Sequence, residues 1–474
     1  MDLATLKALK PTEYSEAAAG YRSASEMAKA AKDRIEKQIV VAMRNSLEGK
    51  AAKAAVEELQ ELGDNFHYIQ MQCGLVSTAL DAFSYEMEAA KKKLDAALES
   101  AKAAKLTVNS DGSVTYPADG EQSADGKLPE GGTVSGLTDD TASAVGRQAA
   151  NLDPNPNRRL AQDCADLIAA ALKEATEADE KWAPKLRALK ADDDLTVSNA
   201  DWADVDEDTA GVRKGADDYL ESFRPPKNGT PAENAKWWSS LTEEQRASYI
   251  AVRPEAIGWM DGLPAAVRDE ANRTVLASAR NAAQLELYAW MAKEPKPVYE
   301  EREIINALTG ERYTARVQTN ESRRRWREWD RKRDELKSTI DSLDALQERI
   351  DKSGDEDFRP YLLGFNEKGH GRVIVSIGNP DTADNVVTYV PGTGTKLSDI
   401  GGDVARAELL RDQAAKIDPS HRTASVMWLG YDAPQGLFTE ATDPKYAESA
   451  REPLSRFLTG LDIDQKLMGF SSRT

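Results

Sequence analysis

A long series of apolar residues, spaced three or four positions apart, is the strongest constraint on how this chain folds. The series keeps its spacing without exception through Leu59, Leu62, Phe66, Ile69, Cys73, Val76, Leu80, Phe83, Met87, Ala90 and Leu94. This spacing places the side chains on one face of a helix, and a sustained series is typical of a coiled coil. We therefore predict one long helix. The residues expected to face inward include Leu62, Ile69, Val76 and Phe83.

A shorter series before it predicts the other half of an antiparallel helical hairpin within residues 1–104. Its members are Tyr14, Ala17, Tyr21, Ala24, Ala28, Ala31, Ile35 and Ala42, and Leu47-Glu48-Gly49 separates the two series. The pattern resembles the W-x-G helical hairpins of type VII secretion, with Leu47 standing in place of the Trp. Their Y-x-x-x-D/E signal does not follow the second helix, because Ala89 comes four residues after Tyr85. Two interpretations stay open: a structural hairpin that packs on the chain or on a second copy, and a helical module for a protein partner.

Residues 105–157 change in character. Leu106 to Tyr116 is predicted to form a small β-hairpin that turns at Asn109 to Gly112. From Pro117 to Asn157 the chain is rich in Gly, Ser, Asp and Pro and poor in large apolar residues. This composition predicts a disordered linker.

Residues 158–355 are predicted to be mainly helical. Thr242 and Gln245 form a capping box, which marks a helix start. The last helix carries Trp326 and Trp329 among basic residues, which are Arg323, Arg324, Arg325, Arg327, Arg331, Lys332 and Arg333. Stacking of bases on Trp beside Arg is one way to bind nucleic acid. We favour a helix with a solvated face and two inward Trp side chains, because the chain carries a net charge of -19 that repels phosphates.

Three apolar runs near the C-terminus predict β-strands. Val373 to Ile377 and Val386 to Val390 are rich in β-branched residues, and turn residues lie between them at Asn379 to Asn385. The third run, Ala424 to Gly430, follows a helical stretch. Runs that are apolar at consecutive positions suit strands covered on both faces. We therefore expect a parallel α/β sheet within residues 356–474.

These motifs resemble a bacterial α/β-hydrolase family that carries a long helical N-terminal region and is classed as a domain of unknown function. The matching segments are Ala256 to Pro264, Tyr361 to Phe365, Asn379 to Asp384, Val390 to Gly394 and Trp428 to Pro434. The resemblance implies a serine hydrolase for esters, amides or similar acyl groups. It also implies a G-x-S-x-G nucleophile elbow after the next strand, with the acid and the His of the triad later still.

The chain reaches Thr474 about where that elbow is expected, so we expect only the first half of the hydrolase sheet and no catalytic residue in this chain. Gly469-Phe470-Ser471 carries Arg473 where an elbow needs a small residue, which indicates chance similarity. Gly392, Thr393 and Gly394 have two interpretations. The resemblance implies an oxyanion loop after the second of these strands, whereas Gly-Thr-Gly alone also suits a plain turn into a helix.

No metal site or cofactor is expected. Asp204, Asp206 and Asp208 alternate as in a calcium loop, but Thr209 and Gly215 stand where such a loop needs Gly and Glu. The histidines, His67, His370 and His421, all precede any position for a hydrolase nucleophile, although the triad order puts His last. The two cysteines, Cys73 and Cys164, imply no disulfide framework.

Together these patterns predict a mainly helical chain with a C-terminal α/β part, in four regions: 1–104, 105–157, 158–355 and 356–474. The function expected from the resemblance is an α/β hydrolase that is inactive as it stands, with a small acyl substrate only if the domain is completed. The alternative is a non-enzymatic helical interaction module linked to type VII secretion, with a homodimer or protein partner through the N-terminal helices. We expect no nucleic acid partner and no membrane span. With no Sec signal, the location stays open between the cytoplasm and a type VII-like export route.

Overall fold

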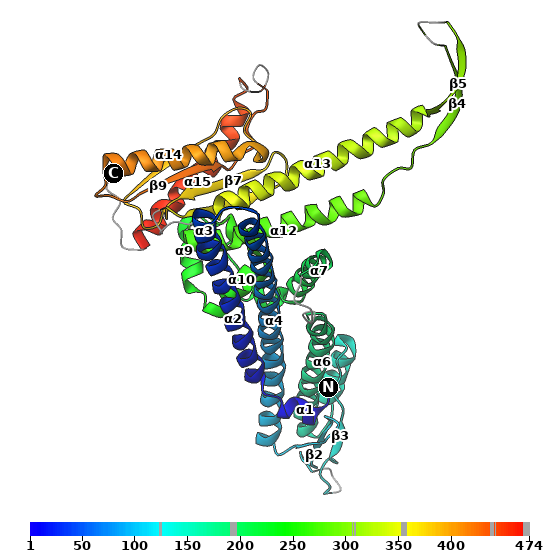
Figure 1. The fold of residues 1–474 in the computed structure, drawn as a ribbon. Helices are drawn as coiled ribbons and strands as arrows, with labels where there is room; N and C mark the ends of the chain where they lie inside the picture. Colours follow the sequence, from blue (N-terminus) through cyan, green and yellow to red (C-terminus); the bar gives the residue numbers. More distant parts are fainter. Residues whose placement is uncertain are drawn as a thin grey trace.

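The computed structural model of the 474-residue chain is mostly helical and carries its main sheet near the C-terminus (Figure 1). This confirms the predicted fold class at that level. The structure describes residues 1–122, 126–189, 197–305, 307, 310–351, 358–436, 440 and 442–467. Within these residues no helix is long and apolar enough to cross a membrane.

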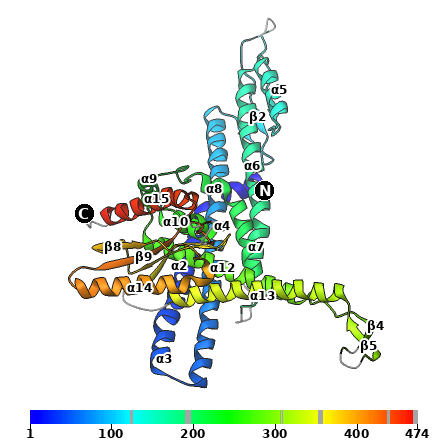
Figure 2. The same cartoon turned by 90° about the horizontal axis from the view of Figure 1, so that it is seen from above.

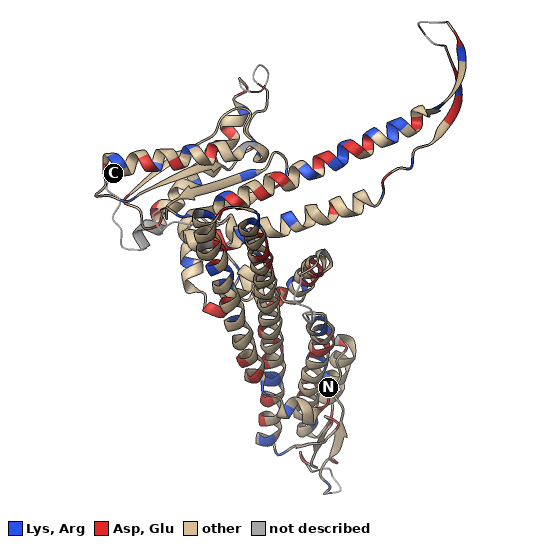
Figure 3. Ribbon diagram, in the orientation of Figure 1, with Lys and Arg blue, Asp and Glu red and all other residues tan. Residues whose placement is uncertain are grey.

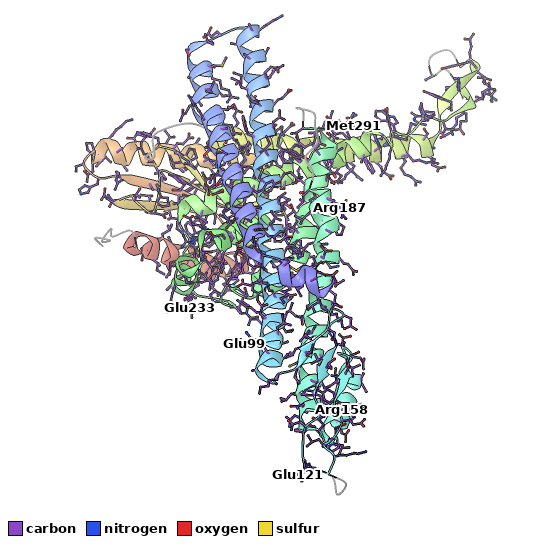
Figure 4. All side chains as sticks on the ribbon, turned by 90° about the horizontal axis from the view of Figure 1, so that it is seen from below. Glu99, Glu121, Arg158, Arg187, Glu233 and Met291 are labelled. Atoms are coloured by element: carbon purple, nitrogen blue, oxygen red, sulfur yellow. The ribbon has the colours of Figure 1, made fainter. Side chains whose placement is uncertain are left out.

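The N-terminal part is built around α4, a helix of 54 residues that is about 80 Å long. Its elements are α1 (Leu3–Ala8), α2 (Pro11–Arg34), the π-helix η1 (Ile35–Ile39), α3 (Val40–Ser46) and α4 (Lys50–Ala103). α2 packs along α4, and α6 (Pro156–Ala188) packs on α4 as well. Figure 4 shows α6 running between the labelled residues Arg158 and Arg187.

Burial along α4 differs from the predicted seam in its first half. Leu62 and Ile69 are each 42 % exposed, whereas Phe83 and Leu94 are buried. The first turns of α4 pair with α3 and project beyond the other helices (Figure 2). Further along, α4 lies between α2 and α6, and alanines on α4 and α6 allow the helices to approach closely. The prediction that Leu62 and Ile69 face inward was therefore wrong. α7 (Asn199–Gly215) packs on the face of this stretch that carries Tyr68, whereas Leu62 and Ile69 lie on a face that remains exposed.

The segment predicted to be a linker contains regular structure. β1 (Thr107–Val108), β2 (Val114–Tyr116) and β3 (Gly132–Val134) form a small antiparallel sheet, and α5 (Asp140–Asn151) follows. The side-chain amide of Asn155 is fully buried and donates hydrogen bonds to the carbonyl oxygens of Pro117 (2.9 Å) and Glu130 (3.0 Å). These bonds hold the segment against α6, so the prediction of disorder fails at β3 and α5. The amino-acid composition did not predict β3 and α5, because their folding depends on contacts with α6.

The middle of the chain forms a helical layer and a projecting arm. The layer contains α7 (Asn199–Gly215), α8 (Asp217–Glu221), α9 (Pro231–Ser240), α10 (Glu243–Val252) and α11 (Pro254–Gly258). The arm contains α12 (Ala265–Met291), β4 (Tyr299–Ile305), β5 (Arg312–Gln318) and α13 (Asn320–Ile350). α12 and α13 run out side by side and carry the β4–β5 hairpin at the far end (Figure 1).

The tryptophans of the arm lie between its two helices. The indole N–H of Trp290 donates to the carbonyl oxygen of Trp329, and the indole of Trp329 donates to that of Trp290, both at 3.0 Å. Trp329 is buried, while the arginines around it lie on the exposed side of α13. Positive and negative side chains alternate along this part of α13 (Figure 3). The Trp side chains therefore serve packing within the arm.

The C-terminal sheet has four strands in the order β6-β7-β9-β8. Its strands are β6 (Pro360–Asn366), β7 (Arg372–Ile377), β8 (Asn385–Tyr389) and β9 (Thr423–Leu429). β8 and β9 are parallel, whereas β7 is antiparallel to both of its neighbours. The sheet is therefore mixed and not wholly parallel as predicted, because the short turn between β6 and β7 can join only antiparallel strands. The segment Tyr361–Phe365 lies within β6, a strand that apolar-run analysis missed.

Helices cover both faces of this sheet. α12, α13 and α14 (Ile400–Ile417) pack on one face, where Leu346 and Val404 meet Val375 in a fully buried cluster. α15 (Lys445–Leu467) packs on the other face and inserts Phe457 beside Trp428. The short helix η2 (Leu397–Asp399) leads into α14. The long connection through α14 allows β9 to return parallel to β8.

A buried ionic cluster joins the helical layer to the sheet. The carboxylate of Asp269 on α12 is 1 % exposed and accepts hydrogen bonds from Arg273 (2.7 Å), Arg359 (2.6 Å) and the backbone N–H of Leu362 in β6 (2.8 Å). Burial acts to raise the pKa of Asp269, but the two guanidinium groups outweigh it and lower that pKa. The carboxylate therefore stays ionised and binds helix to sheet.

We predict that Asp269→Asn lowers the free energy of unfolding by about 3–5 kcal/mol, because it removes the anion that pairs with Arg359 and one of the two carboxylates that pair with the buried Arg273. Asp341→Asn on the exposed side of α13 is the matched control, with an expected change within about 0.5 kcal/mol. Urea unfolding of both variants measures the difference. Equal effects of the two substitutions would contradict a special role for Asp269.

Candidate active site

The carboxyl ends of β8 and β9 meet at one edge of the sheet, which is where open α/β sheets bind ligands. The loop 390–396 follows β8, and the loop 430–436 follows β9. The turn 367–371 between β6 and β7 lies at the same edge, because β7 is antiparallel to β9. Three loops therefore form the candidate site.

Hydrogen bonds fasten the loop after β8 to the loop after β9. The N–H of Gly394 donates to the carbonyl oxygen of Pro434 (2.7 Å), and the hydroxyl of Tyr431 donates to that of Pro391 (2.9 Å). The side-chain amide of Gln435 donates to the carbonyl oxygen of Thr395 (2.9 Å). Gly394 has a φ of 88°, which Gly adopts without strain. The loop is thus held at its start and end.

The middle of this loop presents free backbone donors. Gly392 and Thr393 are exposed, and neither of their N–H groups donates to a residue that the structure describes. Gly394 differs, since its N–H is already bonded to Pro434. Of the three residues that the resemblance pointed to, two offer N–H groups to a ligand, and the third holds the loop in shape.

The turn before β7 closes the other side of the site. The N–H of Leu397 donates to the carbonyl oxygen of His370 (2.9 Å), and Arg372 forms an ion pair with Asp432 (2.7 Å). A Cβ on Gly371 would lie 2.6 Å from Cβ of Leu397, so only Gly allows this close approach. The imidazole of His370 is exposed and forms no hydrogen bond with a described residue.

The other two histidines lie elsewhere. His67 is buried in α4, and His421 precedes β9 at the opposite edge of the sheet. Asp418 and Ser420 both approach the same ring nitrogen of His421, Nδ1, at 2.7 and 3.2 Å. A catalytic triad needs the acid on one ring nitrogen and the hydroxyl on the other. Asp418, Ser420 and His421 therefore form a hydrogen-bonded turn and not a catalytic triad.

No described group of three or more His, Cys, Asp or Glu side chains has the geometry to hold a metal ion. Asp204, Asp206 and Asp208 lie within helix α7, where they cannot wrap around a cation as a calcium loop does. Ser471 lies outside the described residues.

Asp381, a buried carboxyl group with a raised pKa, also lies away from the site. Asp381 follows β7, at the edge opposite the three loops, and it is 2 % exposed. Burial raises its pKa to about 6, although it accepts a hydrogen bond from the N–H of Ala265 (2.7 Å) at the start of α12. It therefore caps α12 from a distant loop and ties the helix to the sheet.

The outer strand β8 carries a second surface, separate from the three loops. β9 lies between β7 and β8, so β8 is the outer strand on this side of the sheet. A groove of about 980 Å³ runs along β8 between the C-terminal end of α14 and the middle of α15. Its walls carry exposed aliphatic side chains, which are Val387, Ile417 and Leu458. An edge of this kind is a template for another strand.

Sequence reasoning missed the residues that shape the loops. Tyr431, Pro434 and Gln435 had no predicted role, although two of them lie in the segment Trp428 to Pro434 that carried the resemblance. Turn residues directly after a buried strand were the available signal. The contacts to the loop after β8 depend on the parallel pairing of β8 and β9, which the sequence does not show.

Comparison with known proteins supports the assignment of this region. Residues 366–469 match a family described as "Alpha/beta hydrolase", which confirms the resemblance for the C-terminal region. An uncharacterized protein of Mycobacterium tuberculosis, Rv2079, is 31% identical over 231 residues, which is 47% of this chain and 31% of that protein. An uncharacterized protein of Mycobacterium bovis, Mb0988c, is 37% identical over 94 residues, which is 18% of this chain and 35% of that protein. This chain thus spans about a third of the length of these relatives. No solved structure matches significantly.

We predict that Asp381 makes stability depend on pH. Its folded-state pKa of about 6 is above its ordinary value of 3.8, so the folded protein binds the proton more tightly and loses stability as pH rises through this interval. The stability of Asp381→Asn relative to the natural protein should therefore rise by about 1–3 kcal/mol between pH 4 and pH 7. Urea unfolding at both pH values measures this change. The exposed Glu367→Gln is the control, and a pH-independent difference for Asp381→Asn would contradict the assignment.

Proposed function

We propose that the C-terminal region acts in the chemistry of α/β hydrolases on acyl compounds, with Gly392 and Thr393 as backbone donors to an oxyanion. The observation that carries this proposal is the pair of free, exposed N–H groups at the carboxyl end of β8. Oxyanion stabilisation needs preorganised donors, because donors that must first reorient give up part of their advantage. The bonds from Tyr431, Gln435 and Gly394 supply that preorganisation.

The nucleophile is the part of this chemistry for which the described residues provide no candidate at the site. In α/β hydrolases the nucleophile lies on a sharp turn between a strand and a helix. The unpaired side of β8, with its aliphatic groove, is a suitable place for a further strand. If that strand ran parallel to β8, its carboxyl end would lie beside the loop of Gly392. We therefore propose that catalysis requires a strand beside β8, and that the described residues alone bind an acyl oxyanion without turning over an ester.

The test uses the chain labelled with ¹⁵N at Gly and Thr and titrated with butyrate, whose carboxylate resembles an acyl oxyanion. We expect the amide signals of Gly392 and Thr393 to move with saturation. The Gly394 signal should stay in place, because its N–H is bonded to Pro434. Thr393→Pro removes one donor and should weaken binding about tenfold or more, because a hydrogen bond to a charged group contributes roughly 1.5–3 kcal/mol.

The same preparation is treated with a fluorophosphonate probe and with p-nitrophenyl acetate. We expect neither labelling nor turnover, because a serine hydroxyl is a weak nucleophile without an oriented base. Labelling at Ser420 or Ser471 that disappears on substitution by Ala would overturn the claim about the nucleophile. Shifts at Gly394 equal to those at Gly392 would overturn the claim about the oxyanion donors.

A second candidate function is a helical interaction module, as for proteins linked to type VII secretion. The observation that favours it is the projecting end of α3 and α4, where Leu47 is 52 % exposed and Leu62 and Ile69 are each 42 % exposed. Exposed aliphatic side chains on one helix face often mark a protein contact. We propose that this face pairs with a second copy of the chain.

Sedimentation velocity tests this second candidate. The chain should associate to a dimer as its concentration rises, and Leu62→Lys with Ile69→Lys should keep it monomeric, since each Lys places a charge in the contact. Leu128→Lys, at an exposed position between β2 and β3, is the control. A natural protein that stays monomeric at all concentrations would rule out this pairing.

A further inference from the structure

A cavity of about 550 Å³ lies where the N-terminal helices cross the base of the arm. Its walls come from α2, η1, α3 and α4 on one side, from α12 and α13 on the other, and from Trp202 of α7. This volume is within the range of small-molecule sites. The cavity is separate from the three loops of the candidate active site and shares no lining residue with them.

The walls are strongly acidic. Their carboxylates are Glu36, Glu57, Glu61, Asp64, Asp344, Glu348 and Asp351, and their cationic side chains are Lys32, Arg44 and Arg280. Ion pairs account for part of this charge: Arg280 pairs with Asp344, Lys32 lies 3.9 Å from Glu36, and Asp351 pairs with Arg273 (2.8 Å). The carboxylates that form no ion pair with any described residue are Glu57, Glu61, Asp64 and Glu348.

Three of these carboxylates follow one another along α4. Glu57, Glu61 and Asp64 are separated by four and three residues, so they share one face of the helix at intervals of about 5–6 Å. Asp64 is exposed to the cavity, but nearby protein atoms remove part of its hydration, and this desolvation raises its pKa although Arg280 and Lys32 act in the opposite direction. A cation beside Asp64 would relieve the cost of its charge.

His67 extends the same face by one further step. It is 3 % exposed and lines the cavity, and neither ring nitrogen has a hydrogen-bond partner among the described residues. Burial and the nearby Lys32 lower the pKa of His67 well below its ordinary value. The side chain of Gln70 acts in the opposite direction, but it does not reach either ring nitrogen with hydrogen-bond geometry. The neutral imidazole therefore offers an unused acceptor nitrogen to the cavity. Trp202 lies beside it, with ring centroids 5.6 Å apart.

The helix that faces α4 across the cavity is wider here, because Ile35–Ile39 form a π-helical turn. The π-helix η1 carries Glu36, and its carboxylate approaches Gly63 on α4, where a Cβ would lie 3.3 Å from the Glu36 oxygen. Single π-helical turns inside α-helices are frequent at functional sites. Gly63 thus leaves space at the wall between the carboxylate of Glu36 on η1 and the carboxylates of α4.

We propose that this cavity binds a linear aliphatic polyamine. Ammonium groups separated by three or four methylenes match the repeat of Glu57, Glu61 and Asp64, and they donate the charge-assisted hydrogen bonds that these carboxylates lack. The amine at the inner end donates to the free nitrogen of His67 and lies near the Trp202 ring, which favours cations. An anion is excluded by the charge of the walls. A compact metal ion would need three close ligands, and the described residues bring no such group together.

Calorimetric titration with spermidine tests the proposal, in about 0.15 M salt so that long-range attraction to the acidic protein is screened. We expect saturable binding at one site. Asp64→Asn and Glu61→Gln should each weaken binding about tenfold, as expected for one lost charge-assisted contact. Glu58→Gln is the matched control, because it removes the same charge from an α4 residue that does not line the cavity.

The ring signals of His67 in a ¹H–¹⁵N spectrum give a second measurement, and they should shift with spermidine while those of His370 and His421 do not. Equal weakening by Glu58→Gln and Asp64→Asn would show attraction to net charge only and would overturn the proposal. Binding of magnesium alone at this site with the same affinity as spermidine would overturn it as well. Unchanged His67 signals at saturating spermidine would place the amine elsewhere and have the same consequence.

Discussion

The buried carboxylate of Asp269 is the interaction on which the arrangement of this protein depends. It belongs to α12, yet it binds the backbone N–H of Leu362 in β6 and the guanidinium group of Arg359, just before that strand. Arg273, one turn along α12, completes its surroundings. A carboxylate this deeply buried is tolerated only when several donors compensate for its lost hydration. The position of the sheet on the helical layer is therefore set by a small number of directional bonds.

Other polar bonds reinforce this joint at nearby positions. Asn272 donates from α12 to the carbonyl oxygen of Leu362, and Arg268 donates to that of Leu363 (3.0 and 2.7 Å). The carboxylate of Asp381, in the loop after β7, accepts a hydrogen bond from the backbone N–H of Ala265 in the first turn of α12. Apolar packing alone tolerates sliding, whereas these bonds fix one register. α12 continues from this joint into the arm and also forms one wall of the acidic cavity, so a single helix links the sheet, the arm and the cavity.

The two proposed sites favour ligands of opposite charge. At the carboxyl ends of β8 and β9, backbone N–H groups are left without acceptors, which suits negative charge that develops on an oxygen. In the cavity between α4 and α13, carboxylates are left without cations, which suits a positively charged ligand. Each site lacks the partner that its own groups require. The open edge of β8 is a third incomplete surface, with a row of backbone groups and exposed aliphatic side chains beside them.

Local patterns in the sequence determined a large part of the fold. The three-and-four spacing predicted a long helix that is present as α4, and the β-branched runs predicted strands that are present as β7, β8 and β9. The loop of Gly392, Thr393 and Gly394 was singled out by the family resemblance, since its Gly-Thr-Gly pattern alone also suits a plain turn. These features are readable because periodicity and turn chemistry act between neighbours in the chain.

The sequence by itself thus determined the long helix, three strands of the C-terminal sheet and the place of the α/β-hydrolase region, whereas β3, α5 and β6 were found only in the structure. Only the tertiary structure decided that Leu62 and Ile69 stay exposed, that β9 lies between β7 and β8, and that Pro434 occupies the N–H of Gly394. It also brought the carboxylates of α4 and α13 to one cavity. The physical reason is the same in each case: burial, strand order and charge environment depend on which distant segments pack together, and no local pattern carries that information.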